Sequence, residues 1–165
     1  IVEPELLMEG NHDAEVCLKK TSEVIKRCYE ELELNNVDLK GTILKPNMIL
    51  PGKNSGEKIS SEKIAELTLD CLKNNVPTSV PGIAFLSGGQ TEIEATANLN
   101  QINRKNDTNF IMTYSYGRAL QQGALKFWSK DIKNIIGTQK IFDHRAKMCT
   151  LAARGKWSEN LENSQ

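Results

Sequence analysis

The stretch Gly41-Thr42-Ile43-Leu44-Lys45-Pro46-Asn47-Met48 places a lysine at the end of an apolar run and a proline directly after it. Proline lacks a backbone N–H and is poorly tolerated inside a central strand, so this stretch predicts a strand that ends at Lys45. The amine would then lie at the mouth of a buried sheet. Apolar surroundings disfavour an ammonium, and the neutral amine that results is a nucleophile. The simpler interpretation is a strand-end lysine that reaches into water.

Strand-like and helical segments alternate along the rest of the chain. The expected strands are the end of one strand over residues 1–7, then 37–45, 81–87 and 109–116. The expected helices cover 13–34 and 60–74, one begins at a Thr91-x-x-Glu94 capping box, one follows Gly117-Arg118, and the last covers 129–153. Such alternation indicates parallel strands joined by helical crossovers. The short apolar strands suit a sheet that is covered on both faces.

Two α/β architectures fit this order. A flavodoxin-like open sheet would begin with a complete strand and protect its own edge. The alternative is a piece of a (β/α)8 TIM barrel, in which eight such units occupy about 250 residues. The chain has 165 residues, and both its incomplete first strand and its lack of an initiator methionine favour the piece. We expect residues 1–156 to form the half barrel and residues 157–165 a polar, frayed tail.

Composition and charge exclude several classes of protein. The 21 basic and 21 acidic side chains cancel, so no broad basic face is available for nucleic acid. The longest apolar stretches are too short to span a membrane, and the acidic N-terminus resembles no signal peptide. Cys17, Cys28, Cys71 and Cys149 form no Cys-x-x-Cys pair, which predicts buried free thiols in a reducing cytosol. The two histidines lie far apart without a nearby ligand cluster, which argues against a metal site.

Side chains that can carry chemistry follow the predicted strands. Glu3 and Glu5 follow the first, Lys45 the second, Ser87 the third and Arg118 the fourth. In parallel βα folds the active site is built at these carboxyl ends. Separately, the two glutamates could be an exposed acidic turn. Beside a lysine on the next strand, they form a credible proton shuttle for carbinolamine formation and dehydration.

The segments Ser87-Gly88-Gly89 and Gly117-Arg118 predict a phosphate site. Two glycines before a helix leave backbone N–H groups open, and the helix dipole favours an anion there. Arg118 opens another helix and offers a forked donor to the same phosphate. Each could also be ordinary: a glycine turn and a surface arginine. Together with the lysine and the glutamates, they predict a Schiff-base site for a phosphorylated carbonyl compound.

Four segments resemble class I fructose-bisphosphate aldolase, in that family's order and at close to its spacing. They are Ile1-Val2-Glu3-Pro4-Glu5, Leu39–Met48, Phe85–Gln90 and Tyr114–Leu120. The resemblance extends to about Lys156 and implies roughly the last four βα units of a TIM barrel. It matches Lys45 to the lysine that forms the Schiff base. It matches Glu3 to the carboxylate that accepts and donates protons, and Glu5 to the neighbour that assists at the lysine.

The resemblance also implies the substrate and the reaction. The residues that match the segment holding the ketose C1 phosphate are Ser87, Gly88, Gly89, Ser115, Gly117 and Arg118. The implied reaction, in glycolysis and gluconeogenesis, is the reversible cleavage of fructose 1,6-bisphosphate to dihydroxyacetone phosphate and glyceraldehyde 3-phosphate. A protonated imine serves as the electron sink, so no metal and no other cofactor is required.

The chain departs from this family in two respects. An earlier half of the family's chain supplies four more strands, with an aspartate for the C4 hydroxyl, another lysine and basic residues for the second phosphate. The family's tail usually ends in tyrosine, but this chain ends Glu162-Asn163-Ser164-Gln165. We therefore expect negligible lyase activity from the chain alone. The expected partners are the other half of the barrel, further copies in a homotetramer and a cytoskeletal protein, and the expected location is the cytoplasm.

Two other functions stay open at this point. The chain could be a non-catalytic half barrel that keeps an assembly or partner-binding surface. It could also belong to another Schiff-base aldolase or a transaldolase on the same fold. The Leu-Lys-Pro-Asn and Ser-Gly-Gly-Gln motifs argue against this last possibility.

Overall fold

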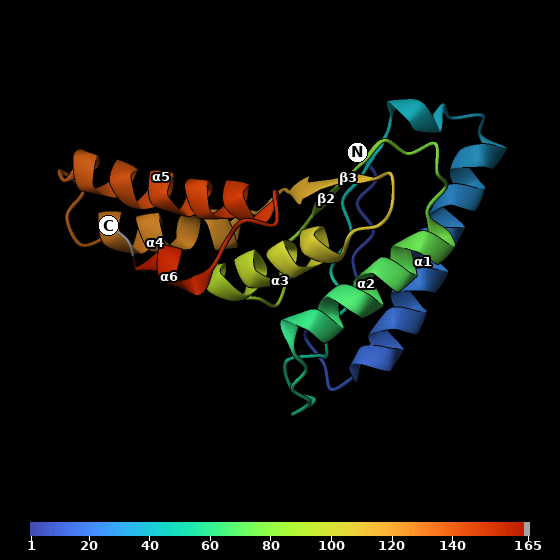
Figure 1. Cartoon of the computed structure of the whole chain (residues 1–165), viewed down its shortest axis with the longest axis horizontal. Helices are drawn as coiled ribbons and strands as arrows, with labels where there is room; N and C mark the ends of the chain where they lie inside the picture. The colour runs from blue at the N-terminus through green and yellow to red at the C-terminus, as the bar shows by residue number, and fades with distance from the viewer. Residues whose placement is uncertain (164–165) are drawn as a thin grey trace.

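Helices and short strands alternate in the computed structural model, which describes residues 1–163 (Figure 1). The elements in chain order are α1 (Ala14–Leu34), the 3-10 helix η1 (Leu39–Gly41), β1 (Ile43–Leu44), α2 (Ser61–Asn75), β2 (Gly82–Phe85), α3 (Glu92–Lys105), β3 (Ile111–Tyr114), α4 (Arg118–Trp128), α5 (Ile135–Ala152) and α6 (Glu159–Glu162). No helix among these residues is both long and apolar enough to cross a membrane.

The strands form one parallel sheet in the order β1-β2-β3. The register pairs Leu44 with Ile83, and Ile83 with Met112. An isolated parallel bridge from Val2 to Leu44 extends the sheet beyond β1. Neighbours in the sheet are therefore neighbours in sequence, the order of strands around a βα barrel. The prediction of a parallel α/β fold is confirmed.

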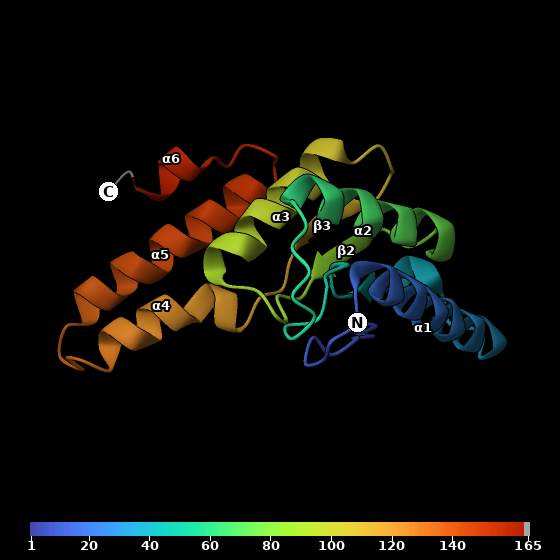
Figure 2. The same cartoon turned by 90° about the horizontal axis from the view of Figure 1, so that it is seen from below.

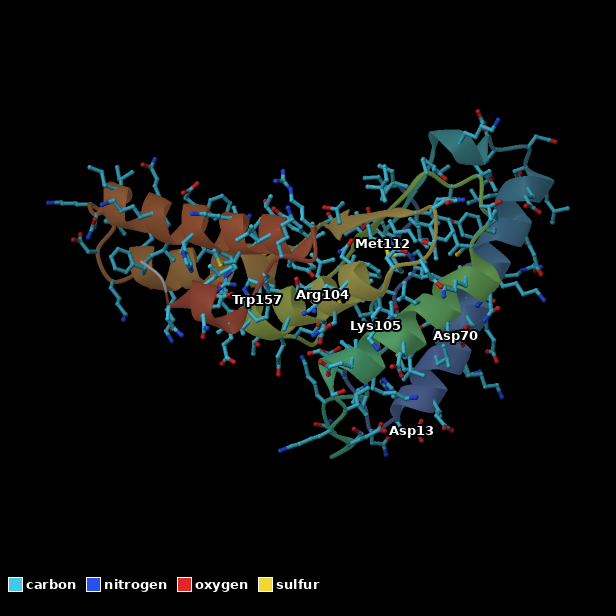
Figure 3. The ribbon with its side chains drawn as sticks, viewed as in Figure 1. Asp13, Asp70, Arg104, Lys105, Met112 and Trp157 are labelled. Atoms are coloured by element: carbon cyan, nitrogen blue, oxygen red, sulfur yellow. The ribbon has the colours of Figure 1, made fainter. Side chains whose placement is uncertain are left out.

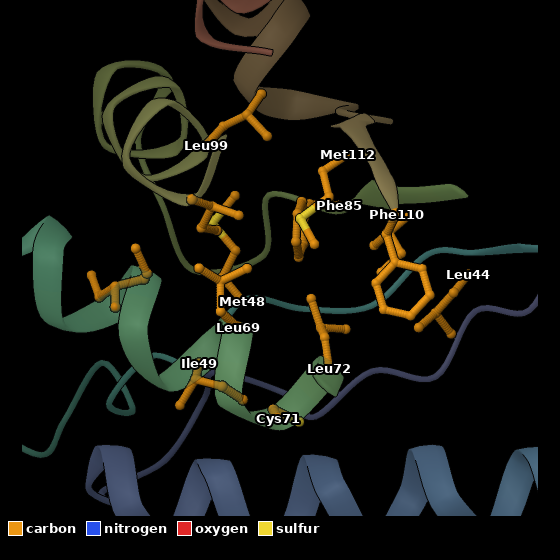
Figure 4. Close-up of a cluster of buried hydrophobic side chains, with 14 of the residues drawn as sticks. Leu44, Met48, Ile49, Leu69, Cys71, Leu72, Phe85, Leu99, Phe110 and Met112 are labelled. Carbon is orange, nitrogen blue, oxygen red and sulfur yellow. The ribbon is translucent and has the colours of Figure 1, made fainter. Parts of the chain in front are cut away.

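One face of the sheet carries the hydrophobic core. Successive side chains of a strand point to opposite faces, and Leu44, Ile83, Phe85 and Met112 all point to the same one. Each of the four is at most 3% exposed. Figure 4 shows them packed against side chains of α2 and α3, and Figure 2 shows that α1, α2 and α3 lie on one side of the strands. Their burial removes large apolar groups from water, which is the main stabilisation available to a sheet this short.

The opposite face of the sheet is open. Ile43 and Ile111 alternate with the buried residues, and their exposed fractions are 44% and 74%. Ile1, next to the residue that bridges to β1, is 80% exposed. A half barrel is expected to leave its inner face uncovered, so the cover on both faces that the apolar strands suit is found on one face only. Helices cover one face, and the apolar residues of the other face have no cover within residues 1–163. We call this second surface the open face.

Two predicted boundaries were wrong for local reasons. The side chain of Asp38 accepts a hydrogen bond from the Lys40 N–H, which caps η1 and shortens the strand predicted over 37–45 to β1. The last long helix begins at Ile135 instead of residue 129, because Asn134 caps it through the Gly137 N–H. Ile132 and Ile136, two apolar positions of the helix expected over 129–153, are at least 65% exposed.

Other helix starts agree with the sequence. Asp13 caps α1, Ser60 caps α2, and Thr91 forms the complete capping box of α3 with Glu94. All four cysteines are free and lie in helices, as expected. Three of them are buried, whereas Cys28 is only half-buried.

The C-terminal segment is anchored in its described part. Arg145 of α5 and Glu162 of α6 form a bidentate ion pair with N–O distances of 2.8 and 2.7 Å. The Trp157 indole donates to the same carboxylate, and its backbone N–H donates to the side chain of Asn100 on α3 (Figure 3). The expected frayed tail covers residues 157–165, of which 164–165 lie outside the described residues, and the contacts above hold Trp157 and Glu162 in place.

Candidate active site

An ion pair joins the carboxyl end of β1 to the segment that follows the Val2 bridge. The Lys45 N–H donates to the Val2 carbonyl at 2.7 Å, which sets Lys45 level with Glu3. The Lys45 Nζ lies 3.0 Å from the Glu3 Oε2. A carboxylate at this distance is within reach for proton transfer to and from the amine. The two residues matched from sequence thus lie together, at the end of the sheet where such sites are built.

The environment of the amine differs from the sequence expectation. Lys45 follows Leu44 in β1, and because Leu44 points to the helices, Lys45 points to the open face. Its side chain is 24% exposed and that of Glu3 is 54% exposed. The apolar enclosure predicted for this amine is therefore absent from the described residues. The reason is the open face itself, since an enclosure would have to come from groups opposite the sheet.

Glu5 lies beside the glycine loop that follows β2. Its Oε1 is only 2.7 Å from the point that a Cβ on Gly88 would occupy. Gly89 has a φ of +80°, and a Cβ there would approach Met8 to 2.6 Å. Both glycines thus permit close packing of two loops, and the second also permits a left-handed backbone. Glu5 contacts this loop, whereas the ion-pair partner of Lys45 is Glu3.

The residues matched to a phosphate site follow β2 and β3, which are neighbours in the sheet. Phe85 is paired with Tyr114, and the Ser115 N–H donates to the Phe85 carbonyl at 2.9 Å. Ser87 therefore follows β2 at the level where the loop after β3 begins. That loop is fixed by Tyr116, which is 6% exposed and whose hydroxyl donates to the Ala95 carbonyl. Burial raises the pKa of this phenol well above its ordinary value, so it stays a neutral anchor.

The N-terminus of α4 is open to solvent. Gly117 is its N-cap without a side-chain hydrogen bond, and a Cβ built there would meet nothing within 4 Å. Arg118 is exposed at the first helical position. Hydrogen bonding from Lys53 lowers the pKa of the Glu9 carboxyl, and the charge of Arg118 adds a smaller effect. This places Arg118 within electrostatic reach of Glu9. Open N–H groups, a helix dipole and a guanidinium together suit an anion.

Comparison with known proteins identifies the family. The family model for class-I fructose-bisphosphate aldolase matches residues 1–165. The chain belongs to this family. It is 49% identical over 163 residues to the cytosolic fructose-bisphosphate aldolase 4 of Arabidopsis thaliana, covering 98% of this chain and 42% of that one. It is 47% identical to a probable class 1 aldolase of Xanthomonas campestris, covering 95% of this chain and 47% of the relative.

A solved aldolase has the same fold. The Plasmodium falciparum aldolase, determined in a ternary complex with TRAP and a small-molecule inhibitor, superposes with a TM-score of 0.90 at 39% identity. The match covers 94% of this chain and 45% of that one. The chain thus spans less than half the length of these aldolases. This confirms the prediction that it supplies part of a TIM barrel.

The chain also contains a buried residue for which no role was predicted. Asn47, two residues after Lys45, is 3% exposed and hydrogen-bonded to Leu6, Thr21 and Met48, with a longer 3.9 Å contact to the Cys17 Sγ. The only signal was an amide beside a strand-end lysine. Cavities of about 590 and 630 Å³ lie behind the glycine loop and beside α5, and neither is lined by Lys45 or Glu3. Among the described residues, no group of three or more His, Cys, Asp or Glu is arranged to hold a metal ion.

Proposed function

We propose that this chain is the Schiff-base half of a fructose-bisphosphate aldolase. The whole enzyme would reversibly cleave fructose 1,6-bisphosphate to dihydroxyacetone phosphate and glyceraldehyde 3-phosphate. The observation that carries the proposal is the 3.0 Å contact between the Lys45 Nζ and the Glu3 Oε2 on the open face. Family membership supports it, because class I aldolases are the Schiff-base class.

The proposed chemistry uses side chains alone. The neutral Lys45 amine adds to the ketose C2 carbonyl, and loss of water from the carbinolamine leaves a protonated imine. Glu3 accepts the amine proton and returns a proton to the departing hydroxyl. As the C3–C4 bond breaks, the C4 hydroxyl would give its proton to a base supplied by the other half of the barrel, the aldehyde leaves, and the electron pair converts the protonated imine to an enamine. Protonation of the enamine at C3 and hydrolysis of the imine then release dihydroxyacetone phosphate and the lysine amine. Glu5 would assist at the lysine from its position beside Gly88. No metal or other cofactor has a step in this sequence.

The C1 phosphate would bind between the two loops that follow β2 and β3. The glycine loop and the open start of α4 supply backbone N–H groups, and Arg118 supplies a guanidinium. The full proposed set is Ser87, Gly88, Gly89, Ser115, Gly117 and Arg118. A phosphate held between these loops would orient the ketose carbonyl toward the Lys45 amine.

We further propose that the other half of the barrel covers the open face. The exposed Ile43 and Ile111 form an apolar surface next to Lys45, and the chain has less than half the length of its relatives. Closing the barrel would bury these residues and supply the groups for the second phosphate. A homotetramer and a cytoskeletal partner remain proposals, as does a cytoplasmic location. The location is supported by relatives named cytosolic in Arabidopsis thaliana and cytoplasmic in Spinacia oleracea.

A complementation assay tests this function. The chain is mixed with the first half of the Arabidopsis thaliana relative, and cleavage of fructose 1,6-bisphosphate is measured for each half and for the mixture. We expect turnover from the mixture and background rates from each half. Lys45→Met should abolish it, whereas Lys73→Met, which removes an exposed lysine paired with Asp107, should not. Two results would refute the proposal: high turnover from the isolated chain, or an inactive but stable complex.

A non-catalytic assembly module is the second candidate. One observation favours it: the α4–α5 patch, where Leu125, Trp128 and Ile136 are 54%, 45% and 70% exposed. The two helices extend away from α1 and α2 (Figure 1), and a cavity of about 410 Å³ lies between them. Sedimentation of the chain discriminates the two functions when it is combined with labelling of Lys45. A defined oligomer that never forms an imine, even with the other half bound, would support the module.

A further inference from the structure

Asn47 joins three parts of the fold through one buried amide. Its Oδ1 accepts a hydrogen bond from the Leu6 N–H at 3.0 Å. Its Nδ2 donates to the Thr21 hydroxyl on α1 and to the Met48 carbonyl, both at 3.1 Å. The side chain thus uses its acceptor and both donors while it is only 3% exposed. A buried amide with these bonds fixes the relative positions of its partners.

The position of Leu6 makes this contact relevant to the site. Leu6 follows Glu5 directly, and the bridge at Val2 is the last sheet contact before both glutamates. Beyond that bridge, residues 3–8 have no regular secondary structure. On the other side, Pro46 limits the backbone between Lys45 and Asn47. The amide therefore connects the segment that carries the carboxylates to the strand that carries the lysine.

We infer that Asn47 is a positioning residue for the carboxylates. It holds residues 3–6 against the end of β1, which keeps Glu3 at hydrogen-bond distance from Lys45 and Glu5 beside Gly88. Without the amide, the Leu6 N–H loses its partner. The segment is then held at its two ends: by the Val2 bridge, and by Met8, which packs on Gly89 and whose carbonyl accepts a hydrogen bond from the Lys53 N–H at 2.9 Å. The catalytic consequence rests on the proposed function, whereas the restraint on residues 3–8 does not.

A purely structural role for Asn47 makes a different prediction. In that case every hydrogen bond of the amide would matter only for global stability. Thr21→Val is the matched control, because it removes the hydroxyl bond from Asn47 to α1 and leaves the bond to Leu6, together with the longer 3.9 Å contact to the Cys17 Sγ. Both Asn47→Leu and Thr21→Val should lower the stability of the chain, since each leaves a buried polar group unpaired. Only Asn47→Leu should release residues 3–8.

Hydrogen exchange of the 165-residue chain tests the restraint directly. At a temperature where circular dichroism shows all variants folded, Asn47→Leu should speed exchange of the Leu6 amide at least about tenfold, the loss of its acceptor bond. Exchange in α3 should not change, and Thr21→Val should alter residues 3–8 by less than about twofold. If Asn47→Leu does not fold, Asn47→Ser, whose hydroxyl is too short to reach Leu6, takes its place. Unchanged exchange at Leu6, or an equal effect of Thr21→Val, would overturn the inference.

The catalytic consequence has its own readout. Borohydride trapping of dihydroxyacetone phosphate on Lys45 should slow about tenfold in Asn47→Leu at saturating ligand, with an unchanged half-saturating concentration. Asn47→Asp keeps an acceptor for Leu6 and should recover most of this rate. If the unaltered chain is not labelled with the other half bound, the proposed function fails, and hydrogen exchange still decides the role of Asn47. Normal labelling of Asn47→Leu would contradict a positioning role.

Discussion

The two faces of the small parallel sheet differ in what covers them and in what they carry. On the helix-covered face, Phe85 is fully buried, with Ile83 at 1% exposure beside it. On the open face, the same strands present Ile111 at 74% exposure and, at their carboxyl end, the Lys45–Glu3 pair. Alternate residues of one strand therefore serve different purposes: those on the covered face stabilise the fold, and those on the open face include the candidate reactive group. The covered face holds this chain together, while the open face carries a reactive pair whose surroundings must come from elsewhere.

The largest effect is expected on the covered face. Phe85→Ala removes a fully buried aromatic ring at the centre of the core and should lower the free energy of unfolding by about 3–5 kcal/mol. Urea unfolding followed by circular dichroism measures this loss. A cost below about 1 kcal/mol would show that this face does not carry the stability of the chain.

The C-terminal anchor tests whether stability extends along the helical layer. Glu162→Gln leaves the buried Arg145 guanidinium without its carboxylate and should cost about 1.5–3 kcal/mol at neutral pH. Burial alone would raise the pKa of Glu162, but hydrogen bonds from Arg145 and Trp157 lower it below its ordinary value. A lowered folded pKa gives stability that is present above the unfolded value of 4.5 and lost as the pH falls through the folded value.

Unfolding measurements at several pH values check that sign. The stability difference between the unaltered chain and Glu162→Gln should be constant above pH 4.5 and should shrink below it. Glu159→Gln, an exposed carboxylate at the start of α6, is the matched control and should show no comparable difference. An anchor that strengthens as the pH falls would contradict the assignment.

The glycine loop between the two faces should show an intermediate effect. Gly89→Ala places a side chain at φ +80° and against Met8, which should cost about 1–3 kcal/mol of stability. Gly88→Ala meets the ends of two flexible side chains, Glu5 and Leu86, and should cost less, but it should displace the Glu5 carboxylate and slow imine formation. Equal stability losses for the two variants would contradict this difference between neighbouring glycines.

The smallest effect on the isolated chain is expected on the open face. Ile111→Ser should change its stability by less than about 0.5 kcal/mol, because the residue is already largely in water. The same change should weaken binding of the other half at least about tenfold, since that contact would bury the isoleucine. Titration calorimetry measures the binding. An unaffected affinity would show that the partner does not cover this face.

Contacts between residues close in sequence could be predicted, whereas most contacts between distant residues could not. The Thr91–Glu94 capping box depends on residues three apart, and it forms as predicted. The closeness of Glu3 and Lys45 followed from parallel neighbouring strands, which the alternation of elements indicated. By contrast, the Arg145–Glu162 ion pair joins residues from different helices, and no periodic pattern in the sequence predicts it.

The remaining errors have physical causes in the same contrast between faces. Asp38 capped a 3-10 turn where an apolar run suggested a strand, because a local side-chain bond outweighed strand propensity. Ile132 and Ile136 are apolar positions of the last long helix expected from the sequence, yet both are exposed, because apolar spacing does not determine whether the same chain buries the side chains. The same reason explains why Lys45 lacks its predicted enclosure. The chain spans less than half the length of its relatives. It therefore keeps the apolar pattern of a whole barrel, whereas the residues that would contact part of that pattern are not among its own.

Site-resolved imine trapping tests the central claim most directly. The chain, alone and with the other half bound, is reduced with borohydride in the presence of dihydroxyacetone phosphate and mapped by mass spectrometry. We predict a single label on Lys45 that is stronger in the complex, absent in Lys45→Met and retained in Lys73→Met. A label on a different lysine, or no label even in the complex, would contradict the assignment of Lys45 as the Schiff-base residue.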